Sequence, residues 1–341
     1  MIKLALSLLL FFVIIKPGYS EQFYVNYKTG NDANPGTKTL PLRTIKEAAL
    51  RVNLYTEKIG DTILLSAGVH LLTETVLFNN NRFNKDHRLV IQAEIMPDDQ
   101  EWSPQQMPII VTVVPIKVIA GAGEEARGLE IETSHVTIAG LRFIGSPDYY
   151  YIDGKENRRS YPIWRDGKDL DDLVVTQCLF VGNTDVMPLR VAIIANGQGL
   201  VVDHCVFYYC ENPVVFWNAN GGSYHNAMRY CLVYGSHYSG VWTTKNTAED
   251  FEFHHNIIAA GRAGWINENK VAHYQVHDCI FTGNTNLTAN GGNSAIASDF
   301  MQTENVQMKG DIEIEKDQGK KNYLQLKEGS FGTELKAGLF K

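Results

Sequence analysis

The chain has 341 residues, of which 44% are hydrophobic and 20% charged, and its formal net charge is −7. This acidic balance argues against broad binding to nucleic acids or anionic membranes, which attract basic surfaces. It also disfavours a polyanionic sugar as the ligand unless positive charge is concentrated locally.

The first 20 residues have the parts of a signal peptide. Lys3 supplies the positive start, Leu4–Ile15 the apolar segment, and Gly18-Tyr19-Ser20 a small-x-small cleavage site. The apolar run is too short to span a bilayer comfortably, and no run near 18 apolar residues follows it. We therefore expect a secreted or periplasmic protein with no membrane span, whose residues 21–341 form one domain.

Residues 21–60 are typical of an N-terminal cap. A strand near Phe23 leads into a loop rich in Gly, Asn and Pro, and a short helix follows. Thr44 and Glu47 predict a capping box at the start of this helix. One apolar face is expected to pack on the domain; it consists of Ile45, Ala48, Ala49 and Val52.

Residues 146–172 form the longest insertion in the chain. It is rich in aromatic and basic side chains, namely Tyr149, Tyr150, Tyr151, Arg158, Arg159, Tyr161, Trp164 and Arg165. Such residues suit stacking on sugars and pairing with carboxylates, and long insertions often build binding walls. An ordinary solvated loop is the alternative.

Five copies of one short phrase follow: LVVTQCLFVGN, LVVDHCVFYYC, NAMRYCLVYGS, FEFHHNIIAAG and YQVHDCIFTGN. Their shared small residues are Cys178, Cys205, Cys231, Asn256 and Cys279, at steps of 27, 26, 25 and 23 residues. A repeat of this length with β-branched and aromatic phrases predicts stacked coils of short strands. Because connections between parallel strands turn right-handed, the sequence predicts an all-β, right-handed parallel β-helix with a short N-terminal cap helix.

The small residues of the phrases are expected to form one buried column at a tight turn, where Cys acts as a small apolar residue and Asn bonds to backbone. Disulfide pairing between neighbouring rungs is the alternative, because an exported chain can oxidise its thiols. Cys210 lies off this column, and no CxxC spacing indicates a metal site. The charged segment 304–341 is expected to be the C-terminal cap.

The block YVNYKTGNDANPGT…PLRTIKEAAL…GDTILLSAGVH resembles the opening of secreted right-handed β-helix proteins of the pectate-lyase-like superfamily. Many members are polysaccharide lyases, so the resemblance implies the fold and a polysaccharide ligand. The fold also hosts hydrolases, epimerases and adhesins, and it does not define the activity. In this superfamily the sheet that would include VVFWN, GVWTT and GWIN lines the substrate groove. Trp217, Trp242 and Trp265 lie on these strands, and the register decides whether each faces groove or core.

The segment TTKNTAEDFEFHHNIIAAGRAGWINENK resembles the catalytic stretch of the chondroitinase-B/alginate-lyase family. Lys245, Asn256 and Gly261 match that pattern. The family's catalytic arginine would fall near Asn267 or Glu268, and none is there; Arg262 is a substitute several residues early.

The cofactor is undefined. The family's calcium-binding acidic pair would fall at Tyr238 and Gly240, so its calcium ligands are not matched. Adjacent strand residues point to opposite faces, so His254 and His255 are not expected to share a zinc ion.

The resemblance implies β-elimination on a uronate polymer with Lys245 and Arg262 as catalytic residues. A solvated lysine at a strand end is the alternative for Lys245. The expected substrate-binding residues are Trp217, Asn218, Asn220, Arg229, Trp242, Asn246, His255, Asn267, Glu268 and Lys270. The sequence thus favours a monomeric polysaccharide lyase, with a non-catalytic carbohydrate-binding or surface β-helix protein as the alternative.

Overall fold

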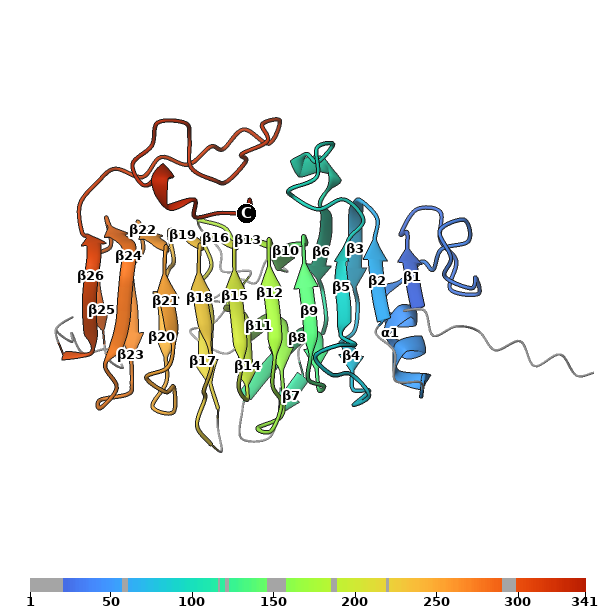
Figure 1. Ribbon diagram of the computed structural model, residues 1–341. Helices are drawn as coiled ribbons and strands as arrows, with labels where there is room; N and C mark the ends of the chain where they lie inside the picture. Colours follow the sequence, from blue (N-terminus) through green and yellow to red (C-terminus); the bar gives the residue numbers. More distant parts are fainter. Residues whose placement is uncertain are drawn as a thin grey trace, which may run out of the picture.

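The computed structural model describes residues 21–56, 61–115, 117–119, 123–145, 158–184, 189–218, 221–289 and 299–341. The predicted signal peptide and residues 146–157 of the predicted insertion lie outside this part of the chain. The described residues wind into a right-handed parallel β-helix, which confirms the fold predicted from the repeat (Figure 1).

Two ladders of parallel strands join into one 17-stranded sheet. The first ladder contains β1 (Glu21–Val25), β2 (Asp61–Leu65), β5 (Leu89–Ala93), β9 (Val136–Ala139), β12 (Leu173–Thr176), β15 (Leu200–Asp203), β18 (Ala227–Arg229) and β21 (Glu252–His254). The second ladder contains β3 (Gly68–Leu72), β6 (Pro108–Thr112), β10 (Arg142–Gly145), β13 (Leu179–Val181), β16 (Val206–Tyr208), β19 (Leu232–Tyr234) and β22 (Ile257–Ala259). Both ladders end on β24 (Tyr274–Thr282) and β26 (Met301–Gln307), which run through the corner between them.

The third ladder is a separate nine-stranded sheet. It contains β4 (Val76–Phe78), β8 (Gly123–Ile131), β11 (Arg158–Arg165), β14 (Val191–Asn196), β17 (Asn212–Trp217), β20 (Ser239–Thr243), β23 (Ala263–Asn267) and β25 (Asn286–Ala289), with β7 (Lys117–Ile119) antiparallel to β8. Part of the predicted insertion is therefore strand β11, because Ile163 and its alternating neighbours fit the register of β8 and β14.

The core lies inside the coil, where equivalent residues of successive rungs stack. Phe143, Phe180 and Phe207 form such a column, with ring centroids 4.9 and 4.8 Å apart and planes 7° from parallel. This spacing is the distance between neighbouring strands of a sheet. The β-helix therefore gains aromatic stacking as a direct result of its repeat.

A left-handed residue turns the chain from the first ladder to the second. These corner residues are Gln177, His204, Tyr230, His255 and Asp278, with φ between 48° and 54°. The next residue on each rung belongs to the predicted column of Cys178, Cys205, Cys231, Asn256 and Cys279, and all five are at most 1% exposed. The column is thereby confirmed, and its cysteines are free thiols.

The cap helix α1 (Ile45–Leu54) buries its predicted apolar face. Thr44 caps the helix by accepting a hydrogen bond from the Glu47 amide at 3.1 Å. The reciprocal half of the predicted capping box is absent, because the Thr44 amide donates to Asp32 Oδ1 at 2.9 Å and Glu47 pairs with Arg51.

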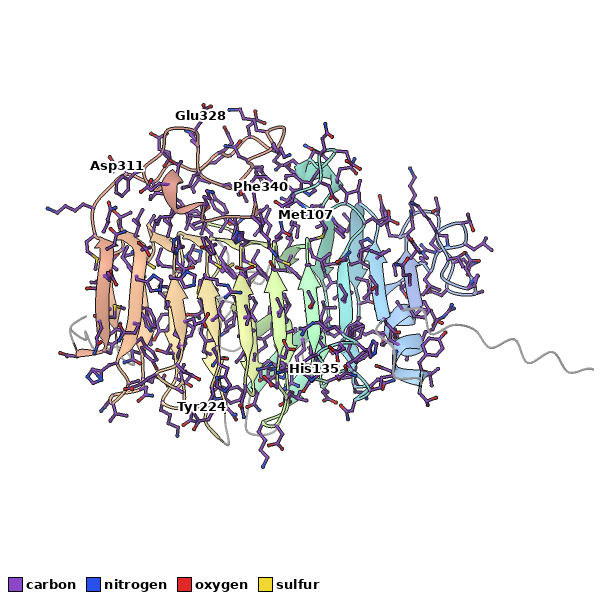
Figure 2. The ribbon with its side chains drawn as sticks, in the orientation of Figure 1. Met107, His135, Tyr224, Asp311, Glu328 and Phe340 are labelled. Atoms are coloured by element: carbon purple, nitrogen blue, oxygen red, sulfur yellow. The ribbon has the colours of Figure 1, made fainter. Side chains whose placement is uncertain are left out.

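The segment after β26 runs back along the outer face of the second ladder. Its apolar side chains, including Ile314, Tyr323 and Leu339, pack on outward residues of the second ladder such as Val206 and Leu232. The short helices η1 (Pro104–Gln106) and η3 (Thr333–Leu335) lie in this layer. Phe340 and Met107, which are labelled in Figure 2, belong to the same apolar cluster. The segment predicted to cap the C-terminal end thus covers one side of the solenoid.

Candidate functional site

The outer face of the third ladder carries an aromatic strip. Its central row consists of outward residues on successive rungs, namely Trp164, Ile194, Val215 and Trp242. Trp217 lies two residues beyond Val215, on the same face, and its ring centroid is 6.3 Å from that of Trp164. Trp217 and Trp242 are half-buried, so each presents part of its ring to solvent.

Strand register decides the direction of each tryptophan. Val215 is the partner of Trp242, so Trp217 is offset by two residues and both rings face outward. Trp265 instead points inward, is 0% exposed, and donates a hydrogen bond from Nε1 to Thr243 Oγ1 at 2.8 Å. Of the three tryptophans noted on these strands, two belong to the outer face and one belongs to the core.

A hollow of about 350 Å³ lies between Trp217 and Trp242. Ile194 and Val215 line it together with the indole rings, and its polar lining comes from Thr244, Lys245, Asn246 and Glu268. Lys245 is exposed and follows the end of β20, where the strand turns toward the next rung. An apolar floor beside a few polar groups is the usual composition of a small-molecule or sugar site.

Arg262 lies at the opposite end of the strands from the hollow. It precedes β23, whereas the hollow lies near the ends of β20 and β23, at the level of the Thr243–Asn267 pair. Five residues of strand separate the two levels, which is about 16 Å along the strand. The Arg262 guanidinium lies 5.4 Å from the centroid of the Tyr238 ring. Lys245 and Arg262 are therefore not placed as neighbours by the strand register.

Two of the expected substrate-binding asparagines are buried corner residues. Asn218 is 1% exposed and donates to the Gly222 carbonyl at 2.9 Å, while Asn267 is 3% exposed and accepts from Thr243 Oγ1 at 3.0 Å. Their amides hold the turns that follow β17 and β23. These two side chains are thus committed to backbone and neighbouring groups, because a turn inside a solenoid must satisfy its own polar atoms.

The remaining expected residues separate into groups. Asn246 and Glu268 line the hollow with Trp217 and Trp242, and Lys270 is exposed outside its lining. Arg229 and His255 lie on and just after the first ladder, away from this face; Arg229 pairs with Asp203 and Glu252 at 3.3 Å each. Asn220 lies outside the described residues. Arg229 and His255 therefore do not line the hollow.

A charged group beside the aromatic strip was not among the site residues expected from the sequence. The Arg127 guanidinium lies 4.0 Å from the centroid of the Trp164 ring and pairs with Glu125, Glu130 and Asp166. The spacing of Glu130 near the end of β8 and Glu132 just after it could have signalled outward carboxylates. Partial burial, followed by the negative charges of Glu130 and Asp166, raises the pKa of Glu132 above its ordinary value.

Among the described residues, the group of histidine and carboxylate side chains with metal-ligand spacing lies at the first ladder, away from this hollow. Within the same part of the chain, no helix has both the length and the apolar character needed to cross a membrane.

No family model and no curated protein matches the chain. Among solved structures, a lacto-N-biosidase from Eubacterium ramulus aligns with 84% of this chain and 67% of its own, at 11% identity and a TM-score of 0.50. A rhamnogalacturonan lyase aligns over 94% and 99% of the two chains, at 12% identity and a TM-score of 0.38. Pectin methylesterase PemA from Erwinia chrysanthemi aligns over 92% and 94%, at 11% identity and a TM-score of 0.39. Such identities concern the fold alone, and the parallel ladders of the structure confirm the predicted likeness to right-handed parallel β-helix proteins.

Proposed function

We propose that this is an exported, carbohydrate-active β-helix protein that binds a glycan chain along the outer face of the third ladder. The observation that carries the proposal is the hollow between the half-buried rings of Trp217 and Trp242. Indole rings offer flat apolar surfaces to the C–H faces of sugars, and neighbouring polar groups orient the hydroxyls. A solved structure of similar fold is that of a lacto-N-biosidase, a protein named for action on a carbohydrate, which agrees with this proposal.

The polar groups around the strip favour hydroxyl-rich sugars. Glu268 lines the hollow. Beside the strip, Glu130 lies on β8 and Asp166 lies just after β11, and both pair with Arg127. Carboxylates accept hydrogen bonds from hydroxyl groups but repel a polymer of high negative charge. We therefore expect neutral or sparsely charged glycans to bind best.

Binding is tested by titrating the purified chain with a panel of soluble polysaccharides and following tryptophan fluorescence. Trp217→Ala or Trp242→Ala should each weaken binding by about 1 kcal/mol, about fivefold in Kd, through lost stacking. Tyr27→Ala is the matched control, because Tyr27 is an exposed aromatic residue near the N-terminal cap, 39% accessible. Unchanged affinity in both tryptophan variants would refute this face as the glycan site.

A second candidate function is β-elimination on a uronate-containing polymer, with Lys245 as the base. Its supporting observation is the position of Lys245 beside Asn246 on the rim of the hollow. In this reaction the Lys245 amine takes the C5 proton, and the electron pair of the C5–H bond forms the C4–C5 double bond. The bond from C4 to the glycosidic oxygen breaks, and that oxygen takes up a proton. Asn246 would offer an amide to the uronate carboxylate.

Lyase activity is tested with pectate, alginate, hyaluronan and chondroitin, with and without calcium, by the absorbance of the unsaturated product. Lys245→Ala should abolish turnover with little change in thermal stability, because the side chain is exposed. Lys316→Ala is the control, an exposed lysine on the segment over the second ladder. No product from any uronate polymer, together with fluorescence-detected binding, would establish the binding function over the lyase.

A further inference from the structure

A group of imidazole and carboxylate side chains occupies the corner between the first and second ladders. His254 ends β21, and its parallel partner on the next rung is His277 of β24. Each is followed by the corner residue of its rung, His255 and Asp278 respectively. The group therefore comes from two successive rungs of one parallel sheet.

The left-handed corner places consecutive side chains on the same side. In a regular strand His254 and His255 would point to opposite faces. At the corner, φ is 54° for His255 and 52° for Asp278, and the alternation breaks. The Nδ1 atoms of His254 and His255 consequently face one another at 3.0 Å. The strand alternation that argued against a shared ion therefore does not hold at this corner.

The donor atoms converge at metal-ligand distances. One ligand atom each from His255, His277 and Asp278 lies within 4.8 Å of the others. In tetrahedral geometry, zinc–nitrogen and zinc–oxygen bonds of about 2.1 Å place ligand atoms about 3.4 Å apart, so side-chain rotations must bring the widest pair closer by about 1.4 Å. His277 Nδ1 already lies 3.0 Å from Asp278 Oδ2.

Neighbouring groups orient these ligands. The Tyr230 ring packs on His255 with centroids 4.7 Å apart, and the His254 ring stacks on His277 at 4.9 Å. Asn305 donates a hydrogen bond to Asp278 Oδ1 at 2.6 Å, which leaves Oδ2 toward His277. Outer partners of this kind are characteristic of metal sites, because they fix ligand orientation.

We propose that His255, His277 and Asp278 form a binding site for one divalent transition-metal ion, best satisfied by zinc, with His254 available as a fourth ligand. Two or three imidazoles with one carboxylate suit zinc, whereas calcium prefers an all-oxygen set. The ion would tie the rungs of β21 and β24 together at the C-terminal part of the coil. The site lies at the first ladder and is independent of the proposed glycan hollow.

The test is isothermal titration of zinc chloride into the full chain, prepared without a polyhistidine tag and stripped with a chelator. We expect one zinc ion per chain, and at least tenfold weaker binding in His277→Ala and in His255→Ala. Asp278→Asn keeps the side-chain shape and removes its charge, and it should also weaken binding about tenfold. His225→Ala is the matched control, because His225 forms a single exposed pair with Asp250, Nδ1 to Oδ2 2.8 Å. His225 follows Tyr224, which Figure 2 shows at the opposite end of the strands.

Thermal unfolding provides a second readout that does not depend on activity. Zinc should raise the Tm of the unmodified chain and of His225→Ala, because a ligand that binds only the folded state stabilises it. Calcium should leave the Tm unchanged, and zinc should not raise it in His277→Ala or Asp278→Asn. Unfolding of each variant in chelator shows whether it is folded before titration. Absence of zinc binding, or equal affinity in the folded His277→Ala, Asp278→Asn and His225→Ala variants, would overturn the proposal.

Discussion

Replacing Asn256 by leucine should destabilise the β-helix strongly, because this side chain joins two rungs from inside the buried column. Asn256 is 0% exposed. Its Oδ1 accepts from the Cys231 amide at 2.9 Å, and its Nδ2 donates to the Met228 carbonyl at 2.7 Å. Leucine would leave both backbone groups buried without these partners.

The expected magnitude follows from those two bonds. Each unsatisfied buried group costs about 1–3 kcal/mol, so two cost about 2–6 kcal/mol. The gain from burying leucine and the penalty for overpacking are each about 1–3 kcal/mol and offset one another. We therefore expect Asn256→Leu to lower the free energy of unfolding by about 3 kcal/mol.

Chemical denaturation followed by tryptophan fluorescence measures this change. Asn256→Cys is the informative control, because cysteine occupies the column on the other rungs. On the next rung, Cys279 Sγ already accepts a hydrogen bond from the backbone amide of Asn256 at 3.4 Å. That variant should lose only about 1 kcal/mol, since sulfur keeps a weak acceptor for the Cys231 amide. A loss below about 0.5 kcal/mol in Asn256→Leu would refute the reasoning that these bonds hold the rungs together.

Three further outcomes can be measured on the same chain. Trp265→Ala should lower the free energy of unfolding by about 3–5 kcal/mol in denaturation, because its ring is fully buried, whereas Trp242→Ala should lower it far less. Burial lowers the folded-state pKa of His70 and His204 below 6.5, so the unfolded chain binds protons first. The contribution of these two histidines to the free energy of unfolding is present above pH 6.5 and is lost as the pH falls toward the folded-state pKa values. A Tm that rises from pH 7.5 to 5.5 would contradict this. The thiols should resist alkylation at pH 8 until the chain is unfolded, because burial raises the pKa of Cys279 to about 12 and shields the other cysteines from the reagent. Rapid labelling of the native chain would disprove the buried column.

The repeat by itself determined the architecture. A β-helix is quasi-one-dimensional, so each coil contacts only its neighbours and equivalent residues must stack. For this reason the spacing of Cys178, Cys205, Cys231, Asn256 and Cys279 predicted both the parallel ladders and their buried column. The cap helix was similarly predictable, because its apolar face and Thr44 cap are local features.

Only the tertiary structure decided which side chains meet on the surface. The register of β17 against β20 placed Trp217 and Trp242 on the outer face, since a shift of one residue reverses the face of a strand. Arg262 and Lys245 were separated because they lie at opposite ends of the strands. The left-handed corner brought His254 and His255 together, against the alternation that a strand pattern assumes. The spacing of the repeated sequence segments gives the length of a coil but not the positions of its corners. The corners determine which neighbouring residues share a face.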